Sequence, residues 1–398
     1  MQASPSSFDA VVVGTGVAGL ASALALARRG VHVALLGPKP PLPTPAPDTY
    51  DPRVYAISPA SRDFLLGLGA WSAIPEARIA PVTAMAVSGD GATVHLDAGQ
   101  ASMADLAAVV EGQELERALR NALQVFGVAW TQARFAGLTR RAGSHGIELF
   151  TDERQILSTA LVVAADGAAS PVRQAAGLSA QRRDYDAIGL VVHLDAELPH
   201  RGVARQWFTP RGVLALLPMP DTQGARPQVS MVWSMRRSEA DTLLALPAEE
   251  ANARLGLLLA EATGQQLGAL TPRSRLLGFP LALLTAPRVA APGVALVGDA
   301  AHVVHPLAGQ GLNLGLGDAH ALAEAVGARE PFRGPGDERV LRRYQRARAE
   351  AVTAMRLATD GLYHLYDAPL GPLRRAGMDL VERLPFAKRL LIRRASQF

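Results

Sequence analysis

The part of the sequence that most constrains the fold is a glycine-rich turn near the start of the chain. Residues 8–13 (FDAVVV) are expected to form a buried strand, and residues 14–19 (GTGVAG) follow it directly. Residues 20–29 are typical of an Ala/Leu helix that Gly30 ends, and residues 31–36 (VHVALL) predict a second strand. A G-x-G-x-x-G turn in this strand–turn–helix–strand context predicts a dinucleotide-binding unit.

The three glycines of this turn have separate expected tasks. Gly14 makes the tight turn, Gly16 lets a pyrophosphate approach the backbone, and Gly19 lets the helix pack closely on the strand. The helix N-terminus offers free N–H groups and a partial positive charge to the phosphates. The alternative is a glycine-rich turn without a ligand, which the flanking strands and helix disfavour.

Two further motifs follow apolar strands in the same way. Residues 165–173 (ADGAASPVR) come after a predicted strand at 160–165, and residues 298–313 (GDAAHVVHPLAGQGLN) come after one at 294–297. In open α/β sheets the carboxyl ends of the strands form the edge at which ligands bind. We therefore expect all three motifs at one site.

The remaining segments predict a second sheet and a helical tail. Residues 82–96 alternate around a Gly-Asp-Gly turn, which indicates a hairpin. Residues 104–127 predict one long helix, because leucines recur there every four residues. Residues 182–284 are β-rich around a predicted helix at 248–263, and the sequence is expected to be helical from about residue 338 onward.

Composition excludes several kinds of site and partner. The 398 residues contain no cysteine, so disulfides, thiolate nucleophiles and cysteine-ligated metals are excluded. The net charge is +4, and residues 334–398 hold 13 basic and 7 acidic residues, an excess too local and too modest for a nucleic-acid-binding protein. No metal site is expected. Without a run of 18 apolar residues or a secretory signal, the expected location is the cytoplasm.

The three motifs, in this order and spacing, resemble the FAD-dependent aromatic monooxygenases of the para-hydroxybenzoate hydroxylase class. Within that class the chain looks most like the ubiquinone-biosynthesis hydroxylase family. The resemblance covers nearly the whole chain and is weakest at residues 39–49 and after residue 370. Further segments that carry it are 51–58, 110–113, 305–318, 343–345 and 359–362.

This resemblance implies an α/β fold with a Rossmann-type FAD-binding domain, an inserted β-sheet substrate domain and a helical C-terminal segment. The FAD-binding domain is expected in three parts, residues 1–80, 101–181 and 285–335. Residues 182–284 and the hairpin at 81–100 would form the substrate domain, and residues 336–398 the helical segment.

The resemblance also implies FAD as the cofactor, NAD(P)H as a transient co-substrate, and O2. Asp299 would accept hydrogen bonds from the ribityl chain, and residues 309–313 would face the pyrimidine end of the ring. Pro306 and Gln310 would form the surroundings in which oxygen reacts at the flavin. The implied cofactor-binding residues are Gly14, Gly16, Gly19, Arg53, Gln113, Asp166, Gly298, Asp299, Pro306, Gly309, Gln310, Gly311, Leu312 and Asn313.

Several of these residues have a purely structural alternative. Asp166 and Asp299 would otherwise be helix N-caps, and Arg173 is expected to be a structural ion-pair partner. His302 and His305 are expected to pack or hydrogen-bond within their loop. Trp207 and Phe208 are candidates for the substrate site, but such a pair on a strand more often belongs to the core.

The implied function is the hydroxylation of a phenolic ring through a flavin C4a-hydroperoxide, with a polyprenylated ubiquinone precursor as the substrate. The alternatives are a flavin hydroxylase of another aromatic metabolite and a weakly flavinated, non-catalytic scaffold of a biosynthetic complex. Gly37 supports the scaffold, because an acid that grips the adenosine ribose usually stands at this position. On that basis we expect Gly37→Glu to tighten FAD binding.

The end of the chain combines basic and apolar residues at near-helical spacing. Residues 370–398 contain seven basic residues against two acids, interleaved with leucine, methionine, valine, isoleucine and phenylalanine. Such a segment predicts peripheral contact with an anionic membrane. The alternative is a helix that packs its apolar face on the flavin domain, and both can hold together.

Overall fold

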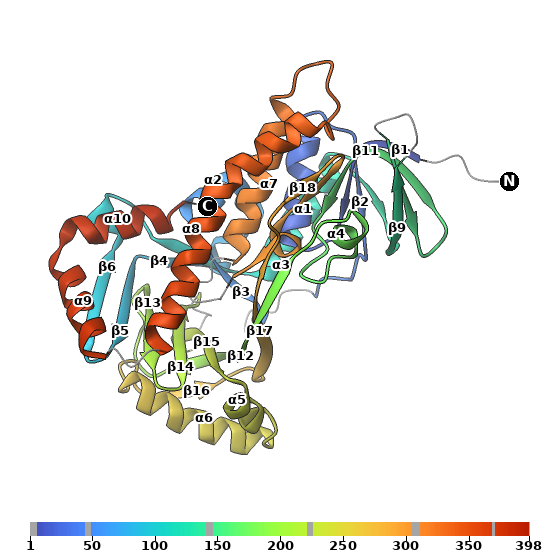
Figure 1. The fold of residues 1–398 in the computed structure, drawn as a ribbon. Helices are drawn as coiled ribbons and strands as arrows, with labels where there is room; N and C mark the ends of the chain where they lie inside the picture. Colours follow the sequence, from blue (N-terminus) through green and yellow to red (C-terminus); the bar gives the residue numbers. More distant parts are fainter. Residues whose placement is uncertain are drawn as a thin grey trace.

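The computed structural model describes residues 6–43, 49–140, 146–220, 226–304, 311–367 and 371–397 (Figure 1). A mostly parallel sheet forms one end of the molecule. β1 pairs in parallel with β2 and β11, and β11 pairs in parallel with β19. The order is β18 (Ala290–Ala291), β19 (Val294–Leu296), β11 (Ile156–Ala164), β1 (Ser6–Val13), β2 (Val33–Leu36) and β8 (Ala129–Thr131).

Other elements cover both faces of this sheet. Alternate residues of a strand point to opposite sides, so each face has its own core cluster. Ala10 and Val12 pack toward α1 (Val17–Ala27), α3 (Gly112–Val125) and α7 (Gly311–Gly327). Val11 and Val13 pack toward α4 (Pro171–Ala175) and β10 (Ile147–Thr151), which pairs with β9 (Phe135–Arg140). The parallel strands consequently read as unbroken apolar runs.

A second sheet, largely antiparallel, lies beside the first. Its face toward α5 (Arg237–Leu244) and α6 (Ala248–Thr263) holds the core, in which Leu214, Leu216 and Trp233 are fully buried. The order is β20 (His302–Val303), β17 (Leu277–Thr285), β12 (Gln181–Ala196), β15 (Gln228–Arg236), β14 (Gly212–Pro218), β13 (Val203–Thr209), β5 (Ala84–Gly89) and β6 (Ala92–Asp97), with β16 (Leu270–Pro272) on β12. β5 and β6 confirm the predicted hairpin, and β5 extends the sheet through parallel pairing with β13.

The predicted helix over residues 104–127 is wrong in its first third. β7 (Ala107–Glu111) is the central strand of a small sheet, between β3 (Val54–Ile57) and β4 (Ile79–Val82). Val109 and Val110 are buried there, and β-branched side chains favour such a strand. The four-residue leucine period begins only with α3. The short helix α5 was not predicted from the sequence.

The C-terminal part is helical, as expected. The long helix α8 (Glu338–Asp367) packs on α7, and the buried Tyr344 hydroxyl donates a hydrogen bond to the Leu296 carbonyl of β19 at 2.5 Å. α9 (Gly371–Arg383) and α10 (Pro385–Ala395) then cross to the hairpin β5–β6 at the far end of the molecule (Figure 1). In the described part of the chain, no helix combines the length and apolar character needed to cross a membrane.

Candidate active site

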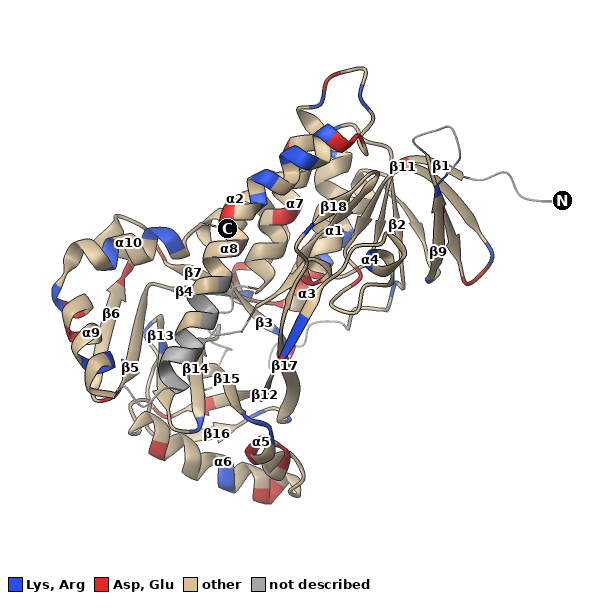
Figure 2. Ribbon diagram, viewed as in Figure 1, with Lys and Arg blue, Asp and Glu red and all other residues tan. Residues whose placement is uncertain are grey.

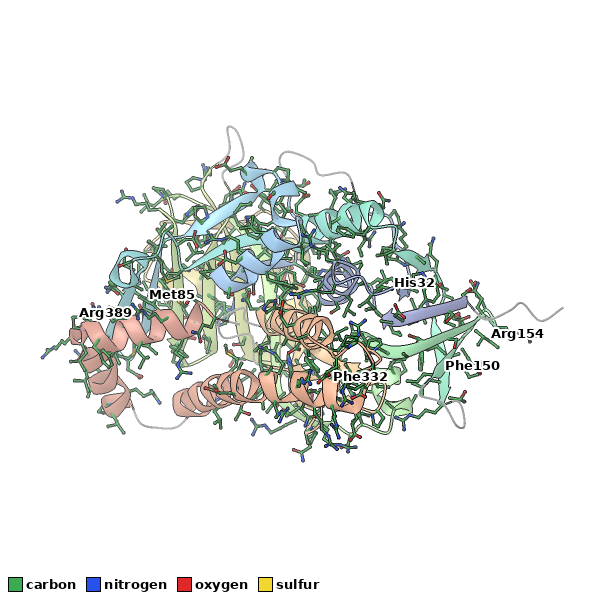
Figure 3. The ribbon with its side chains drawn as sticks, turned by 90° about the horizontal axis from the view of Figure 1, so that it is seen from above. His32, Met85, Phe150, Arg154, Phe332 and Arg389 are labelled. Carbon is green, nitrogen blue, oxygen red and sulfur yellow. The ribbon has the colours of Figure 1, made fainter. Side chains whose placement is uncertain are left out.

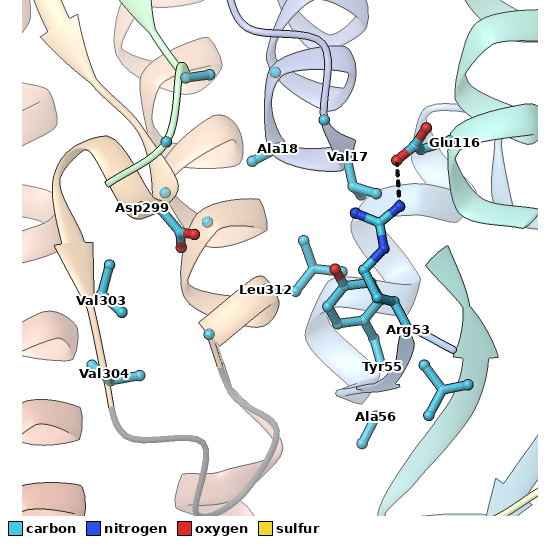
Figure 4. A pocket seen from close by; sticks show the side chains of 18 of the residues that line it. Val17, Ala18, Arg53, Tyr55, Ala56, Glu116, Asp299, Val303, Val304 and Leu312 are labelled. Atoms are coloured by element: carbon cyan, nitrogen blue, oxygen red, sulfur yellow. Dashed lines mark ion pairs between the residues drawn. The ribbon is translucent and has the colours of Figure 1, made fainter. Parts of the chain in front are cut away.

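An elongated cavity of about 950 Å³ runs from the edge of the parallel sheet to the hairpin end of the second sheet. All three motifs contribute to its lining, through residues 13–19, 165–167 and 297–299. Each motif follows a parallel strand, and the Gly14 and Ala165 amides continue the strand hydrogen bonds at this edge. The predicted meeting of the motifs is therefore what the fold produces. Figure 4 shows Asp299, Val303 and Val304 on one side of the cavity, with Arg53 and Tyr55 across from them.

The glycine turn has the geometry that a bound pyrophosphate needs. Gly14 has a φ of +115°, and a Cβ there would stand 2.1 Å from the Ala165 carbonyl oxygen. A Cβ on Gly19 would stand 2.1 Å from the Gly14 carbonyl oxygen, whereas one on Gly16 would meet nothing within 4 Å. Gly16 therefore faces the open cavity at the N-terminus of α1, where no side chain caps the helix. A phosphate anion fits this terminus, because its N–H groups are free.

The two aspartates differ in how they are engaged. The Asp166 carboxylate accepts hydrogen bonds from Ser170 Oγ at 2.6 Å and from the Val172 amide at 3.1 Å. It therefore holds the start of α4, as the structural alternative proposed, and it also lines the cavity. Asp299 projects into the cavity without capping a helix through its side chain. Burial raises the pKa of both carboxyls, against the opposing effect of Ser170 on Asp166 and of His302 on Asp299.

The third motif continues into the N-terminus of α7. Gly311 and Leu312 line the cavity at this helix start, and no acid stands in the first turn. Asn313 does not line the cavity but is buried. Its Oδ1 accepts a hydrogen bond from the Ser58 amide at 3.0 Å, and its Nδ2 donates to the Ala56 carbonyl at 2.9 Å. Asn313 thus ties α7 to β3. Pro306, Gly309 and Gln310, together with His305, lie outside the described residues.

A buried network fixes the turn that carries Asp299. Asp318 on α7 accepts hydrogen bonds from the Gly298 amide at 2.9 Å and from Arg348 Nε at 2.7 Å, and it lies 2.6 Å from His302 Nε2. Burial acts to raise the pKa of Asp318, but His302, Arg348 and the Gly298 amide outweigh burial and lower it. His302 is thus held by an acid on α7 rather than within its own loop.

Arg173 joins the second and third motifs. Its guanidinium donates to the Ala300 carbonyl at 2.8 Å and to the Ala168 carbonyl at 2.8 Å. The expected structural role is present, but the hydrogen bonds go to backbone carbonyls rather than into an ion pair. The two turns are therefore held at a fixed separation on either side of the cavity edge.

Arg53 and Gln113 are placed differently. Arg53 lines the cavity, and its guanidinium lies 3.9 Å from the Glu116 carboxylate on α3. Gln113 lies one turn earlier on α3 and does not line the cavity. Its backbone N–H donates a hydrogen bond to Asp51 Oδ2 at 3.0 Å. A flavin contact by the Gln113 side chain stays a prediction. Tyr55, next to Arg53 in the cavity, was not predicted from the sequence.

A cluster of hydrogen-bonded polar residues links the small sheet to the second sheet. The Glu111 carboxylate accepts the Asp51 amide at 2.7 Å and pairs with Arg78 Nε at 3.0 Å. His193 on β12 hydrogen-bonds to the Asp51 carbonyl at 2.8 Å. Burial raises the pKa of Glu111 to about 7, against the hydrogen bond from Asp51 and the charge of Arg78.

The backbone conformation at position 37 requires a glycine. Its φ is +149°, and a Cβ there would stand 2.8 Å from Thr15 Cγ2 in the glycine turn. Its carbonyl also accepts a hydrogen bond from Trp130 Nε1 at 3.0 Å. The expectation that Gly37→Glu tightens FAD is therefore revised, because any side chain here strains the turn that holds the pyrophosphate. Arg134, which follows β8 beside β2, supplies a polar group to this end of the cavity.

The far half of the cavity is a chamber lined mostly by apolar residues, which we call the apolar chamber. β14 and β15 contribute Ala215, Leu217 and Val232, which alternate with residues that face α6. The chamber is completed by Val82, Met85, Leu96, Leu106, Ala107, Ala204, Val303, Val304, Ile392 and Ala395.

The structure places Trp207 in the core under α6, and neither Trp207 nor Phe208 is among the lining residues. From the same strand, Arg205 and Gln206 line the chamber instead. The contributions of β4, β7 and α10 had no signal in the sequence, because they depend on how distant segments pack.

Comparisons with known proteins agree with this geometry. A family model described as an FAD binding domain matches residues 7–359. The chain belongs to this FAD-binding family. It is an FAD-dependent monooxygenase, and with FAD it uses NAD(P)H and O2.

Relatives of the family span nearly the whole chain. The ubiquinone hydroxylase UbiL of Rhodospirillum rubrum is 34% identical over 97% of this chain and 89% of its own length. The 3-demethoxyubiquinol 3-hydroxylase of Escherichia coli is 32% identical over 97% of this chain and 98% of its own. The solved structure of Klebsiella pneumoniae HpxO with FAD and uric acid has the same fold, with a TM-score of 0.75, 18% identity and 97% of each chain covered.

Proposed function

We propose that this monooxygenase hydroxylates the ring of a polyprenylated phenolic precursor of ubiquinone. The observation that carries the proposal is the apolar chamber, which continues the flavin end of the cavity without a break. A small hydrophilic phenol needs no such chamber, whereas a prenyl tail gains free energy from every apolar surface that it buries. The names of the relatives from Rhodospirillum rubrum and Escherichia coli support the same substrate class.

Different residues along the cavity would hold different parts of FAD. The α1 terminus at Gly16 would hold the pyrophosphate of FAD, Asp299 the ribityl chain, and the α7 terminus at Leu312 the ring. When bound and reduced by NAD(P)H, FAD supplies the oxygen chemistry of the reaction. Val303 and Val304 line the cavity on the same side as Asp299, where their apolar side chains would exclude water from the reacting ring.

Tyr55 is placed to orient a phenolic substrate. Its hydroxyl lies in the cavity opposite Asp299. Burial raises the pKa of this hydroxyl, against the opposing effect of Arg53, so the group keeps its proton at neutral pH. It therefore acts as a hydrogen-bond donor to a substrate or flavin oxygen rather than as a base.

The substrate sets the location and the partners. A polyprenylated precursor lies in the bilayer, so we propose a cytoplasmic protein that works at the inner face of the membrane. Exchange of such insoluble intermediates favours a biosynthetic complex of successive enzymes. Release of active protein from membranes by salt, without detergent, is the expected outcome of fractionation, and a protein extracted only by detergent would contradict peripheral attachment.

The direct test uses the purified protein with FAD, NAD(P)H and phenols that carry no tail, a short prenyl tail or a longer one. We expect isotope-labelled O2 to add one oxygen atom to the ring, with a KM that falls as the tail lengthens. Equal turnover of tailless phenols would favour another aromatic metabolite. A protein that binds FAD but adds no oxygen to any of them would favour the scaffold.

A further inference from the structure

The helices α9 and α10 expose an unusual share of apolar side chains. Six of the sixteen exposed large hydrophobic residues in the described part of the chain lie within residues 371–397, and Phe386 is 72% exposed. Five exposed arginines lie among them, with Asp379 as the exposed acid of the two helices. We call this group the tail surface: Leu373, Leu380, Leu384, Phe386, Leu390 and Leu391, with Arg375, Arg383, Arg389, Arg393 and Arg394.

The opposite face of the same helices is packed on the body of the protein. Met378 on α9 is buried against Ala92 and Val94 of the hairpin. Lys388 on α10 is buried and pairs at 2.8 Å with Glu382, which in turn accepts the His95 amide of β6 at 2.8 Å. The apolar residues of the tail surface are therefore not required to hold the helices in place.

The inner side of α10 also closes the substrate chamber. Ile392 and Ala395 line the cavity together with Leu96 of β6. They stand one helical turn apart, and the exposed Arg393 and Arg394 lie between them on the outer side. One helix thus separates the chamber from the tail surface. Figure 3 shows Arg389 and Met85 at this end of the molecule, opposite Arg154, and Figure 2 shows the basic residues along α9 and α10.

We propose that the tail surface docks on an anionic bilayer and that the prenyl tail passes beside α10 from the bilayer into the chamber. Helices that rest in a membrane interface combine exposed apolar side chains with basic residues that attract anionic headgroups. A second copy of the chain is a poorer occupant, because a two-fold interface would place five arginines against the same five. The route for the tail rests on the proposed function, whereas the docking does not.

Docking is tested without substrate, by co-sedimentation of the full chain with phosphatidylcholine vesicles that contain or lack phosphatidylglycerol. We expect binding at low salt only to the anionic vesicles. The double variant Phe386→Ser/Leu390→Ser should weaken binding about tenfold or more, and Arg389→Gln/Arg393→Gln should weaken it and reduce its salt dependence. The matched controls on α6 are Leu257→Ser, which removes a 67% exposed leucine, and Arg254→Gln.

Absence of binding to anionic vesicles would overturn the docking, as would equal losses in the α6 controls. A concentration-dependent dimer in light scattering that Phe386→Ser/Leu390→Ser dissociates would assign the surface to a second copy instead.

The route is tested with a short-tailed substrate in solution and a long-tailed one in vesicles. Phe386→Ser/Leu390→Ser should raise the KM about tenfold for the vesicle-borne substrate alone. An equal effect on both substrates would overturn the route. Failure of the wild type to hydroxylate either would instead overturn the proposed function, and the docking would stand.

Discussion

The two ends of the cavity are built by different means. At the flavin end backbone forms much of the wall. The Gly14–Gly19 turn lies so close to the second motif that a Cβ at Gly14 would collide with the Ala165 carbonyl, and the Gly298 turn and the start of α7 also contribute. At the chamber end the walls are side chains such as Ala215, Leu217 and Met85, whose sizes can change without moving the backbone. Cofactor binding and substrate choice can therefore vary separately, and the following predictions test that separation.

The largest effect is expected from Gly14→Ala. The added methyl group stands 2.1 Å from a carbonyl oxygen at a φ of +115°, so the parallel sheet must shift. Unfolding by urea should show a loss of about 4 kcal/mol or more. Gly16→Ala is the matched control, because its Cβ meets nothing, and it should keep its stability while losing affinity for FAD. Equal stability losses in the two variants would break the comparison.

Asp299→Ala should weaken FAD without unfolding the protein. The carboxylate faces the cavity, and the loss of a charge-assisted hydrogen bond worth about 1.5–3 kcal/mol corresponds to roughly 10- to 100-fold in Kd. Flavin titration of the apoprotein measures this change, and Asp299→Asn should lose less because it keeps an acceptor. Full flavin occupancy in Asp299→Ala would remove Asp299 from the site.

Gly37→Glu should destabilise the protein by about 1–3 kcal/mol and loosen FAD, because its φ of +149° and its contact with Thr15 admit no side chain. Gly37→Ala carries the same strain without the acid. If the Glu variant binds FAD more tightly than the Ala variant in parallel titrations, a carboxylate at this position does grip the ribose.

At the chamber end, Ala215→Phe should act on the substrate alone. The ring fills space that the prenyl tail would use, so the KM for a prenylated phenol should rise about tenfold, while the Kd for FAD stays unchanged. Ala215→Ser is the size-matched control. A loss of flavin affinity in Ala215→Phe would show that the two ends are coupled.

The smallest effect concerns Glu111, in the polar cluster that links the small sheet to the second sheet. The pKa of Glu111 is raised to about 7 in the folded protein, above its ordinary value of 4.5. Its contribution to stability is therefore present below pH 4.5 and is lost as the pH rises through about 7. Glu111→Gln should flatten the fall in unfolding free energy between pH 5 and 8. Parallel pH profiles in both proteins would contradict the raised pKa.

The flavin end could be predicted from the sequence because its parts are local. Gly14, Asp166 and Asp299 each follow an apolar strand, and parallel strands bring their carboxyl ends to one edge. The need for Gly37 could not be predicted, because the contact with Thr15 exists only after β1 and β2 pair.

The chamber could not be predicted for a related reason. Ala215, Leu96 and Ile392 come from segments more than a hundred residues apart, and nothing in their local sequence indicates that they meet. Strand alternation in residues 203–218 does show two faces, but not which face opens onto a cavity. For Trp207, its aromatic character suggested the site, whereas its packing under α6 decided its place.

The pairing of β1 with β11, and of β11 with β19, also sets the order of events during synthesis. Val13 pairs with Ala164, and Ala164 pairs with Leu296, so the glycine turn waits for strands that the ribosome makes much later. At about 5–20 residues per second the pairing of β1 with β11 is delayed by roughly 8–30 s. During that interval the nascent β1 and β2 expose apolar edges, which favours aggregation. Slower expression at lower temperature, with chaperones that shield the first 160 residues, should therefore raise the soluble yield more than added FAD does.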